Sequence, residues 1–397
     1  MLKIPAEEIA NRLVSFQRLL ANNGTDVAII RHNADLFYFT GTVQDAHLIV
    51  PASGEPVMIV RRNFERAKEQ SPLRPIQPMT SLSELREAVF AACGSKEPGV
   101  IGLELDVVPA NLFFTFNEKL FPKQDIRDIS PMIRRVRTIK SAWEIEQMRN
   151  AAKVGDVVKR AAAEIIREGM SELELDAELE AVARKAGSMG LYRIRTYNNE
   201  MGFGHILSGA DAAIPAYYDA PSGGRGLYSA FGQGCGSRKI GRGEVVSVDN
   251  LVCINGYHND STRNYCIGRP PRKLAEAYDF VTSVYVRFCE IARPGSITGE
   301  LYQTLVQWAE DAGWGKWFMG HAEPKISFVA HGIGIEVDEF PFIAKGQKMA
   351  LEEGMIFAFE PKIVIPDIGM VGLENTCLVN ASGIESLNKA SEELIVL

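Results

Sequence analysis

The first candidates for chemistry are two aspartates in the stretch Val245–Cys266. Two apolar runs in this stretch flank Asn255-Gly256, a dipeptide that favours a two-residue type I′ hairpin turn. With that turn Leu251 lies opposite Asp260, so Asp249 and Asp260 project from one face with Cβ atoms roughly 7 Å apart or somewhat less. Two carboxylates at that separation repel each other unless a cation lies between them. Two interpretations stay open at this point: a metal-binding pair, or one carboxylate near a loop end beside a solvated one.

Three further ionisable side chains interrupt apolar runs later in the chain. His331 is followed by a glycine, which allows close backbone approach to a ligand, although a lone histidine in an apolar strand is more often a hydrogen-bonded core residue. Glu360 and Glu374 face each other if a turn centres on Asp367. Buried glutamates are uncommon unless they are paired or bound to a metal. The sequence therefore predicts a second carboxylate pair.

Together these side chains favour a centre that binds divalent cations. Four carboxylates and one imidazole suit Mn²⁺, Co²⁺, Fe²⁺ or Zn²⁺. Four carboxylates exceed what one cation needs for charge balance, which favours two ions that share bridging carboxylates about 3.5–4 Å apart. We expect two divalent metal ions as cofactors, with manganese as the first choice and cobalt, zinc or iron as alternatives.

The elements that must position these residues fall into two predicted domains. Strands alternate with helices over 1–132, which is typical of a small α/β domain. A basic connector over 133–140 leads to a second domain over 141–397. Capping-box spacing at Ser141 and Ser171 predicts the starts of two helices in that domain.

The rest of the second domain divides into a loop, two helices and a set of strands. The glycine-rich stretch 197–243 is predicted as loop, because no phosphate-binding signature follows its glycines. Helices are predicted over 271–292 and 297–312, and strands over 328–337, 355–365 and 370–379.

Charge, hydropathy and cysteine usage exclude several classes of protein. The 397 residues carry a net charge of -7 without a basic tract, which argues against a nucleic-acid partner. No apolar run reaches the length of a membrane span, and the first residues predict an amphipathic helix rather than a secretory signal. The 6 cysteines are scattered without CxxC spacing, which is typical of reduced thiols. We expect a cytoplasmic protein with no membrane association.

The order Asp249, Asp260, His331, Glu360, Glu374 carries a family resemblance. The motifs are Val248-Asp249, Gly256–Arg263 (GYHNDSTR), His331–Glu336 (HGIGIE), Glu360-Pro361 and Gly372–Glu374 (GLE). On these motifs the sequence resembles the pita-bread metallopeptidase family of aminopeptidase P, prolidase, creatinase and methionine aminopeptidase. The likeness is strong over about 139–397, and the earlier part resembles the creatinase/prolidase N-terminal domain more loosely.

The resemblance implies an α/β creatinase-like N-terminal domain followed by an α+β pita-bread catalytic domain. It implies that all five residues are ligands of a two-metal site. It also implies a homodimer in which the N-terminal domain of one subunit borders the other's cleft.

Two positions depart from the pattern of peptidases in this family. Peptidases of this family usually carry two further histidines beside the metals. At the two matching positions this chain has Ala216 and Asp338. His205 could supply an imidazole from a nearby strand, or it could be an ordinary core or surface histidine. Asp338 could act as a base, accept a hydrogen bond from a cationic substrate group, or face solvent. Tyr257 falls in a matching motif and is a third candidate for substrate binding.

The expected chemistry is attack of a metal-activated water on an amide carbonyl, with Glu360 as the catalytic residue that takes and returns the proton. The expected substrate is a short peptide with proline in second place, cleaved by an Xaa-Pro aminopeptidase or dipeptidase activity. Because Ala216 and Asp338 replace the two histidines, a non-peptidase amidohydrolase or lyase acting on a small molecule is the alternative. A non-catalytic binding protein is the second alternative, which the complete ligand set disfavours.

Overall fold

The computed structural model describes residues 3–94 and 97–397. The chain divides into two compact units, the first ending at Arg137 and the second spanning Thr138–Leu397. The division lies inside the predicted connector 133–140. Much of that stretch is helical, because α6 runs from Ser130 to Thr138.

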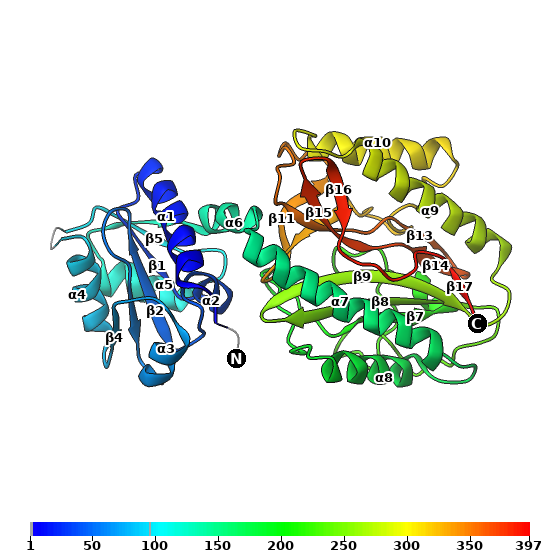
Figure 1. Cartoon of the computed structure of the whole chain (residues 1–397), viewed down its shortest axis with the longest axis horizontal. Coiled ribbons are helices and arrows are strands. Elements are labelled where there is room, and N and C mark those ends of the chain that lie inside the picture. The colour runs from blue at the N-terminus through cyan, green and yellow to red at the C-terminus, as the bar shows by residue number, and fades with distance from the viewer. Residues whose placement is uncertain (1–2, 95–96) are drawn as a thin grey trace. The chain divides into compact units, whose positions relative to one another are not determined.

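The first unit is built on a six-stranded mixed sheet in the order β4-β3-β2-β1-β5-β6, with helices packed against it (Figure 1). The strands are β1 (Val27–Ile30), β2 (Ala46–Pro51), β3 (Val57–Val60), β4 (Ile76–Pro78), β5 (Val100–Leu103) and β6 (Asp125–Asp128). The helices are α1 (Ala6–Asn22), α2 (Asn33–Thr40), α3 (Phe64–Gln70), α4 (Leu82–Ala92) and α5 (Ala110–Phe114), which continues as a π-helical turn over Thr115–Leu120. The alternation of strands and helices thus forms the predicted α/β domain.

The second unit combines three sheets with four long helices. Its helices are α7 (Ala142–Ile165), α8 (Glu172–Lys185), α9 (Arg272–Ile291) and α10 (Thr298–Asp311). One sheet has the order β17-β9-β8-β7, a second β11-β10-β12-β15-β16, and β13 pairs with β14. The strands are β7 (Gly204–Ser208), β8 (Val245–Ile254), β9 (Tyr257–Cys266), β10 (Phe328–Ile333), β11 (Val337–Ala344), β12 (Ile356–Phe359), β13 (Lys362–Ile365), β14 (Gly369–Gly372), β15 (Asn375–Asn380), β16 (Gly383–Ser386) and β17 (Ile395–Val396). This is the α+β pita-bread architecture.

The hairpin of β8 and β9 has the predicted register. Leu251 pairs with Asp260 and Asp249 with Thr262. The turn residues have positive φ, 53° at Asn255 and 87° at Gly256, as a type I′ turn requires. Asp249 and Asp260 therefore lie on one face of the hairpin, and α7 packs against the strands.

Helix starts follow the predicted capping chemistry. Ser141 and Ser171 each accept a hydrogen bond from the backbone N–H three residues on, and the carboxylates of Glu144 and Glu174 accept one from the backbone N–H of the cap residue. Each cap satisfies N–H groups that the first turn of a helix leaves without partners.

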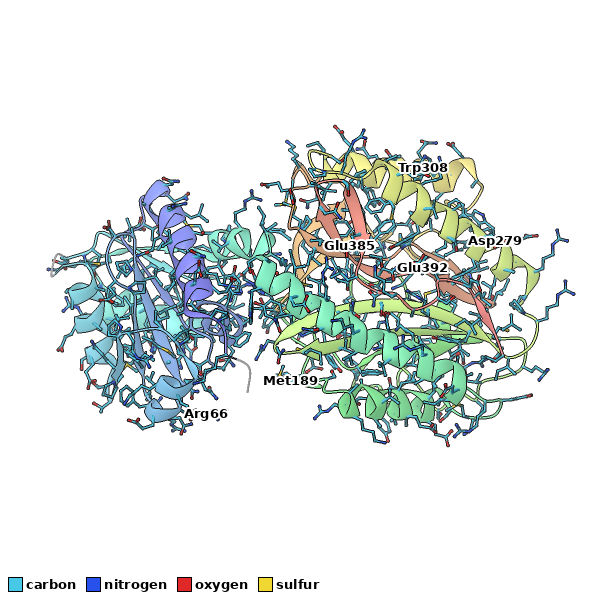
Figure 2. All side chains as sticks on the ribbon, in the orientation of Figure 1. Arg66, Met189, Asp279, Trp308, Glu385 and Glu392 are labelled. Atoms are coloured by element: carbon cyan, nitrogen blue, oxygen red, sulfur yellow. The ribbon has the colours of Figure 1, made fainter. Side chains whose placement is uncertain are left out.

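Helices α9 and α10 pack onto an extended apolar cluster of the second unit. Phe288 of α9 stacks on Phe359 of β12 with ring centroids 3.9 Å apart. Trp308 of α10, labelled in Figure 2, carries the guanidinium of Arg287 3.7 Å above its ring. The cluster supports the strands that carry the later polar residues.

Four sequence predictions need correction. The predicted strand 328–337 ends at Ile333, where the chain turns back into β11, which pairs antiparallel with β10. The predicted strand 355–365 is broken at Glu360-Pro361, where the chain leaves β12 and enters β13. The predicted strand 370–379 is broken in the same way at Leu373-Glu374, between β14 and β15. The predicted loop 197–243 contains β7, which pairs antiparallel with β8. Within the described residues, no helix has the length and apolar character needed to cross a membrane.

Candidate metal centre

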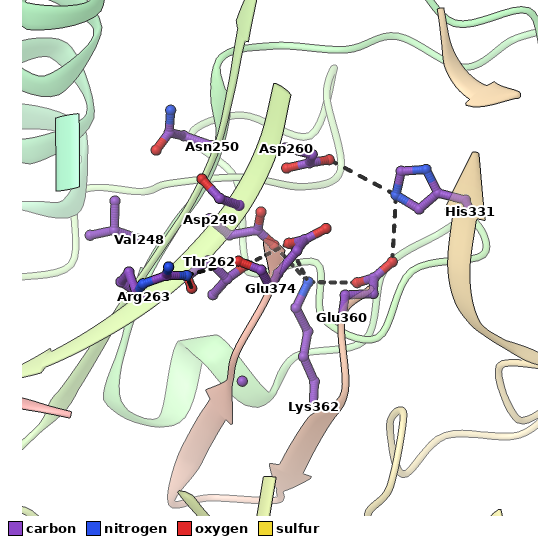
Figure 3. Close-up of polar contacts among 12 residues, drawn as sticks. Val248, Asp249, Asn250, Asp260, Thr262, Arg263, His331, Glu360, Lys362 and Glu374 are labelled. Carbon is purple, nitrogen blue, oxygen red and sulfur yellow. Dashed lines mark hydrogen bonds and ion pairs between the residues drawn. The ribbon is translucent and has the colours of Figure 1, made fainter. Parts of the chain in front are cut away.

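The five predicted ligands, Asp249, Asp260, His331, Glu360 and Glu374, line one pocket of the second unit. Figure 3 shows their side chains converging from the β8–β9 hairpin, from β10 and from the chain around β13 and β14. The pair β13–β14 keeps the register predicted for a turn at Asp367, with Ile363 opposite Val371. Glu360 and Glu374 lie just outside that pair, at the two sheet-to-sheet crossings.

Asp260, His331 and Glu374 form the part of the pocket best suited to a metal ion. One ligand atom from each lies within 4.8 Å of the others. His331 Nε2 is 3.9 Å from Asp260 Oδ2, too far for a hydrogen bond. Asp260 Oδ1 is buried, and no described group makes a hydrogen bond to it. A buried, unsatisfied carboxylate oxygen beside an imidazole fits a divalent ion of the manganese-to-zinc series.

Hydrogen bonds with neighbouring threonines hold two of these three residues. Thr262 Oγ1 donates to Glu374 Oε2 at 2.6 Å. The backbone N–H of Asp260 donates to Thr376 Oγ1 at 3.1 Å, which ties β9 to β15. The Thr262 bond fixes the direction of the Glu374 carboxylate, and the Thr376 bond fixes the backbone that carries Asp260.

Lys362 enters the centre as a cation that the sequence analysis did not predict. Its Nζ donates to Asp249 Oδ2 at 2.9 Å and to Glu360 Oε2 at 2.6 Å. It also lies 3.5 Å from Glu374 Oε2, and its side chain is only 4% exposed. One signal was available: Lys362 follows Glu360 by two residues, a spacing that places alternate strand residues on one face.

The pKa values of these groups are shifted by burial and by one another. Burial, with repulsion from Glu374 and Asp249, raises the pKa of Asp260 well above its usual range. Burial also raises the pKa of Glu374 to about 7, although Lys362 opposes the shift. The pKa of Asp249 shifts the other way: burial favours its neutral form, but the charges of Lys362, His205 and Lys159 and the hydrogen bond from Lys362 together lower its pKa. The raised pKa values mean that Asp260 and Glu374 favour their protonated forms unless a further cation lies beside them.

His205 lies in the pocket, the first of the two positions that the sequence left open. It sits on β7 directly opposite Asp249 and lines the pocket. Burial lowers its pKa, with the Asp249 charge acting in the opposite direction, so the neutral imidazole is favoured. The backbone of Ala216 packs against Gly223, and Tyr218 from the same segment lines the pocket.

Asp338 also lines the pocket. Its Oδ1 lies 3.5 Å from His331 Nδ1, on the ring edge away from Asp260 and Glu360. Its backbone has φ of 65°, which is uncommon outside glycine and marks a specifically held conformation. Although burial disfavours the charged imidazole, Asp338 and the two nearby glutamates raise the pKa of His331.

Tyr257 is not a pocket residue, so that prediction was wrong. It is fully buried, and its hydroxyl donates to Glu144 Oε1 of α7 at 3.0 Å. Strand side chains alternate, so a residue three positions from Asp260 points to the opposite face. Its ring also contacts Trp143 of α7 edge-on at 5.8 Å.

Arg263 of β9 braces the hairpin against the chain around Glu374. Its guanidinium donates to the carbonyl oxygens of Glu374 and Ser391 and to Asn375 Oδ1, at 2.7–2.8 Å. These bonds fix the chain that carries Glu374.

Comparison with known proteins agrees with this geometry. A model of metallopeptidase family M24 matches residues 146–381, and one of the creatinase/prolidase N-terminal domain matches residues 12–139. An Xaa-Pro dipeptidase of Pyrococcus furiosus is 28% identical over 97% of this chain and 99% of the relative. An Xaa-Pro dipeptidase of Lactobacillus delbrueckii subsp. lactis is 27% identical over 97% and 98%.

Solved structures show the same fold. A prolidase from Pyrococcus horikoshii has a TM-score of 0.81 at 25% identity, covering 97% of this chain and 100% of its own. An Xaa-Pro dipeptidase from Bacillus anthracis, with a TM-score of 0.83 at 24% identity, covers 98% and 100% and supports the fold alone. The chain belongs to metallopeptidase family M24 and is a hydrolase of that family with a creatinase/prolidase N-terminal domain.

Proposed function

We propose that this protein is a metal-dependent peptidase that releases the first amino acid from short Xaa-Pro peptides. The observation that carries the proposal is the cluster of Asp260, His331 and Glu374 within one pocket, with Glu360 beside it. Relatives named Xaa-Pro dipeptidase match nearly the full length of the chain and support the substrate class.

A divalent ion held by Asp260, His331 and Glu374 would supply Lewis acidity for activating water and polarising an amide carbonyl. Glu360 is the proposed group that accepts and returns the proton. Its Oε1 lies 3.7 Å from His331 Nε2, and its other oxygen is held by Lys362. The fixed carboxylate therefore presents one oxygen toward the centre, the arrangement that general base catalysis needs.

Substrate contacts are proposed for His205 and Asp338. A neutral His205 can donate a hydrogen bond to the scissile carbonyl from its position opposite Asp249. Asp338 presents a partly exposed carboxylate beside His331, which suits the α-ammonium group of a peptide.

The test is hydrolysis of Xaa-Pro dipeptides, Xaa-Pro-Yaa tripeptides and matched Xaa-Ala peptides by protein loaded with Mn²⁺ or Co²⁺. We expect metal-dependent release of the first residue from the proline substrates only. The dipeptide and tripeptide arms separate a dipeptidase from an aminopeptidase. If the protein turns over a small amide or a sulfonium acid but hydrolyses no peptide, the non-peptidase alternative replaces this proposal. Ala216 and Asp338 keep that alternative open.

Glu360→Gln is expected to lower kcat by about 10²–10⁴-fold, since positioned general bases contribute that much. KM should change little, because the amide keeps the shape of the carboxylate. Glu353→Gln makes the same chemical change at an exposed position and should leave both constants unchanged. An active Glu360→Gln variant would remove Glu360 from the role of base.

Manganese as the bound metal, a homodimer and a cytoplasmic location complete the proposal. They derive from the sequence and the family resemblance. Metal analysis of protein purified without added metal, and its molar mass by light scattering, test the first two. A mass equal to that of one chain would contradict the homodimer.

A further inference from the structure

We propose that the Lys362 ammonium replaces one of the two predicted cations, so that the centre binds a single divalent ion at Asp260, His331 and Glu374. The inference concerns the number of ions. It rests on the proposed function only in assuming that a divalent ion binds, and it makes no assumption about the substrate.

The contacts of Lys362 are those of a cation between carboxylates. Its Nζ lies 2.9 Å from Asp249 Oδ2, 2.6 Å from Glu360 Oε2 and 3.5 Å from Glu374 Oε2. Figure 3 shows the amino group at the point where these three side chains converge. An ammonium with three acceptor oxygens around it fills the position that a bridged second ion would need.

The fold holds Lys362 in this position by two independent features. Its backbone pairs with Gly372 in β13–β14, and its carbonyl oxygen accepts from the N–H of Met319. A Cβ at Gly372 would lie 2.4 Å from Lys362 Cγ. The aliphatic part of the Lys362 side chain therefore passes over Gly372 of β14, and a residue with a side chain there would clash with it.

The remaining ligands fit one ion. Asp260 Oδ1 is buried and accepts no hydrogen bond from any described group, and His331 Nε2 lies 3.9 Å from Asp260 Oδ2. Neither residue contacts Lys362 within ion-pair distance among the described pairs. The pocket thus separates into a lysine-bound side with Asp249 and Glu360 and an ion-binding side with Asp260 and His331, joined by Glu374.

A second divalent ion would have to displace the lysine. Placed against Asp249 and Glu360, it would lie next to the ammonium in a pocket with little water, where repulsion between cations is weakly screened. Displacement would also leave a buried ammonium without its acceptors, because the Lys362 side chain is only 4% exposed.

The test counts ions and needs no substrate. Apoprotein is equilibrated with Mn²⁺ by dialysis, the bound metal is measured by mass spectrometry, and electron paramagnetic resonance distinguishes an isolated Mn²⁺ from an exchange-coupled pair. We expect one ion per chain in the wild type, with the spectrum of an isolated ion. Lys362→Ala should bind two ions and give the coupled spectrum, because Asp249 and Glu360 are released.

Lys153→Ala is the matched control, since it removes an exposed lysine of α7 and should leave the count at one. Asp249→Asn in the wild-type background should also retain one ion, because Asp249 is held by Lys362 and not by metal. Circular dichroism checks that each variant is folded. If Lys362→Ala does not fold, the numbers of ions bound by the wild type and by Asp249→Asn test the proposal by themselves.

Two ions or none in the wild type, one ion in a folded Lys362→Ala, or loss of the ion in Asp249→Asn would overturn the proposal. Failure of the peptidase assay with one ion bound would count against the proposed function and leave the stoichiometry standing.

Discussion

The pKa values of the carboxyl groups in the centre depend on burial and on the charges of neighbouring residues. Asp249 and Asp260 come from one hairpin, yet their pKa values move in opposite directions. Lys362 is bonded to Asp249 and lowers its pKa, whereas burial and repulsion from Glu374 and Asp249 raise that of Asp260. Two carboxylates with divergent pKa values take different roles. The shifts favour the charged form of Asp249 and the protonated form of Asp260, so a metal ion bound at Asp260 would compete with its proton.

Metal affinity should therefore fall as the pH drops below about 7. Burial raises the pKa of Glu374 to about 7 in the apoprotein, so its carboxyl group is increasingly protonated below that pH, and a metal must displace the proton. We expect the affinity for Mn²⁺ to fall roughly tenfold per pH unit for each proton displaced. Titration calorimetry at pH 6 in buffers of different ionisation enthalpy should reveal proton release. Equal affinities at pH 6 and pH 8 would contradict the shift.

At the scale of single elements, the β8–β9 hairpin was predictable because its determinants are local. Asn255-Gly256 fixes the turn, the turn fixes the register, and the register puts Asp249 and Asp260 on one face. Capping at Ser141 is equally local. Such features depend on residues a few positions apart, which a sequence displays directly.

The elements that were mispredicted depend on contacts distant in sequence. The runs through Glu360 and Glu374 read as continuous strands, but each strand changes its partner there, because β12 and β15 pair in one sheet and β13 and β14 in another. Lys362 was overlooked for the same reason. Its bond to Glu360 is local, but its bond to Asp249 joins residues 113 positions apart, and that contact cannot be seen in the sequence.

Tyr257 provides a test of how α7 supports the hairpin. Tyr257→Phe removes the hydrogen bond to Glu144 and should lower the free energy of unfolding by about 1–2 kcal/mol, since a buried carboxylate loses a donor. Peptide turnover should be unchanged, because Tyr257 lies on the face away from the pocket. Tyr218→Phe is the matched comparison within the pocket, and it should lower kcat/KM with little effect on stability. Reduced turnover in Tyr257→Phe at full stability would restore it as a substrate contact.

At the scale of the whole molecule, the two units have separate apolar cores. The core of the first unit gathers around residues such as Val27, Ile101 and Phe116, and that of the second around residues such as Phe288 and Phe359. All five predicted metal ligands belong to the second unit. A ligand stabilises only the cooperative unit that binds it in its folded form.

Thermal unfolding should therefore show two transitions, and a divalent ion should raise the midpoint temperature of only one of them. At a free Mn²⁺ concentration of 100 times Kd, binding adds about 2.7 kcal/mol to the stability of the second unit and nothing to the first. Differential scanning calorimetry with and without metal measures both transitions, and His331→Ala identifies the metal-dependent one by abolishing its shift. Because every ligand lies beyond Thr138, an equal shift of both transitions would mean that the two units unfold as one cooperative block.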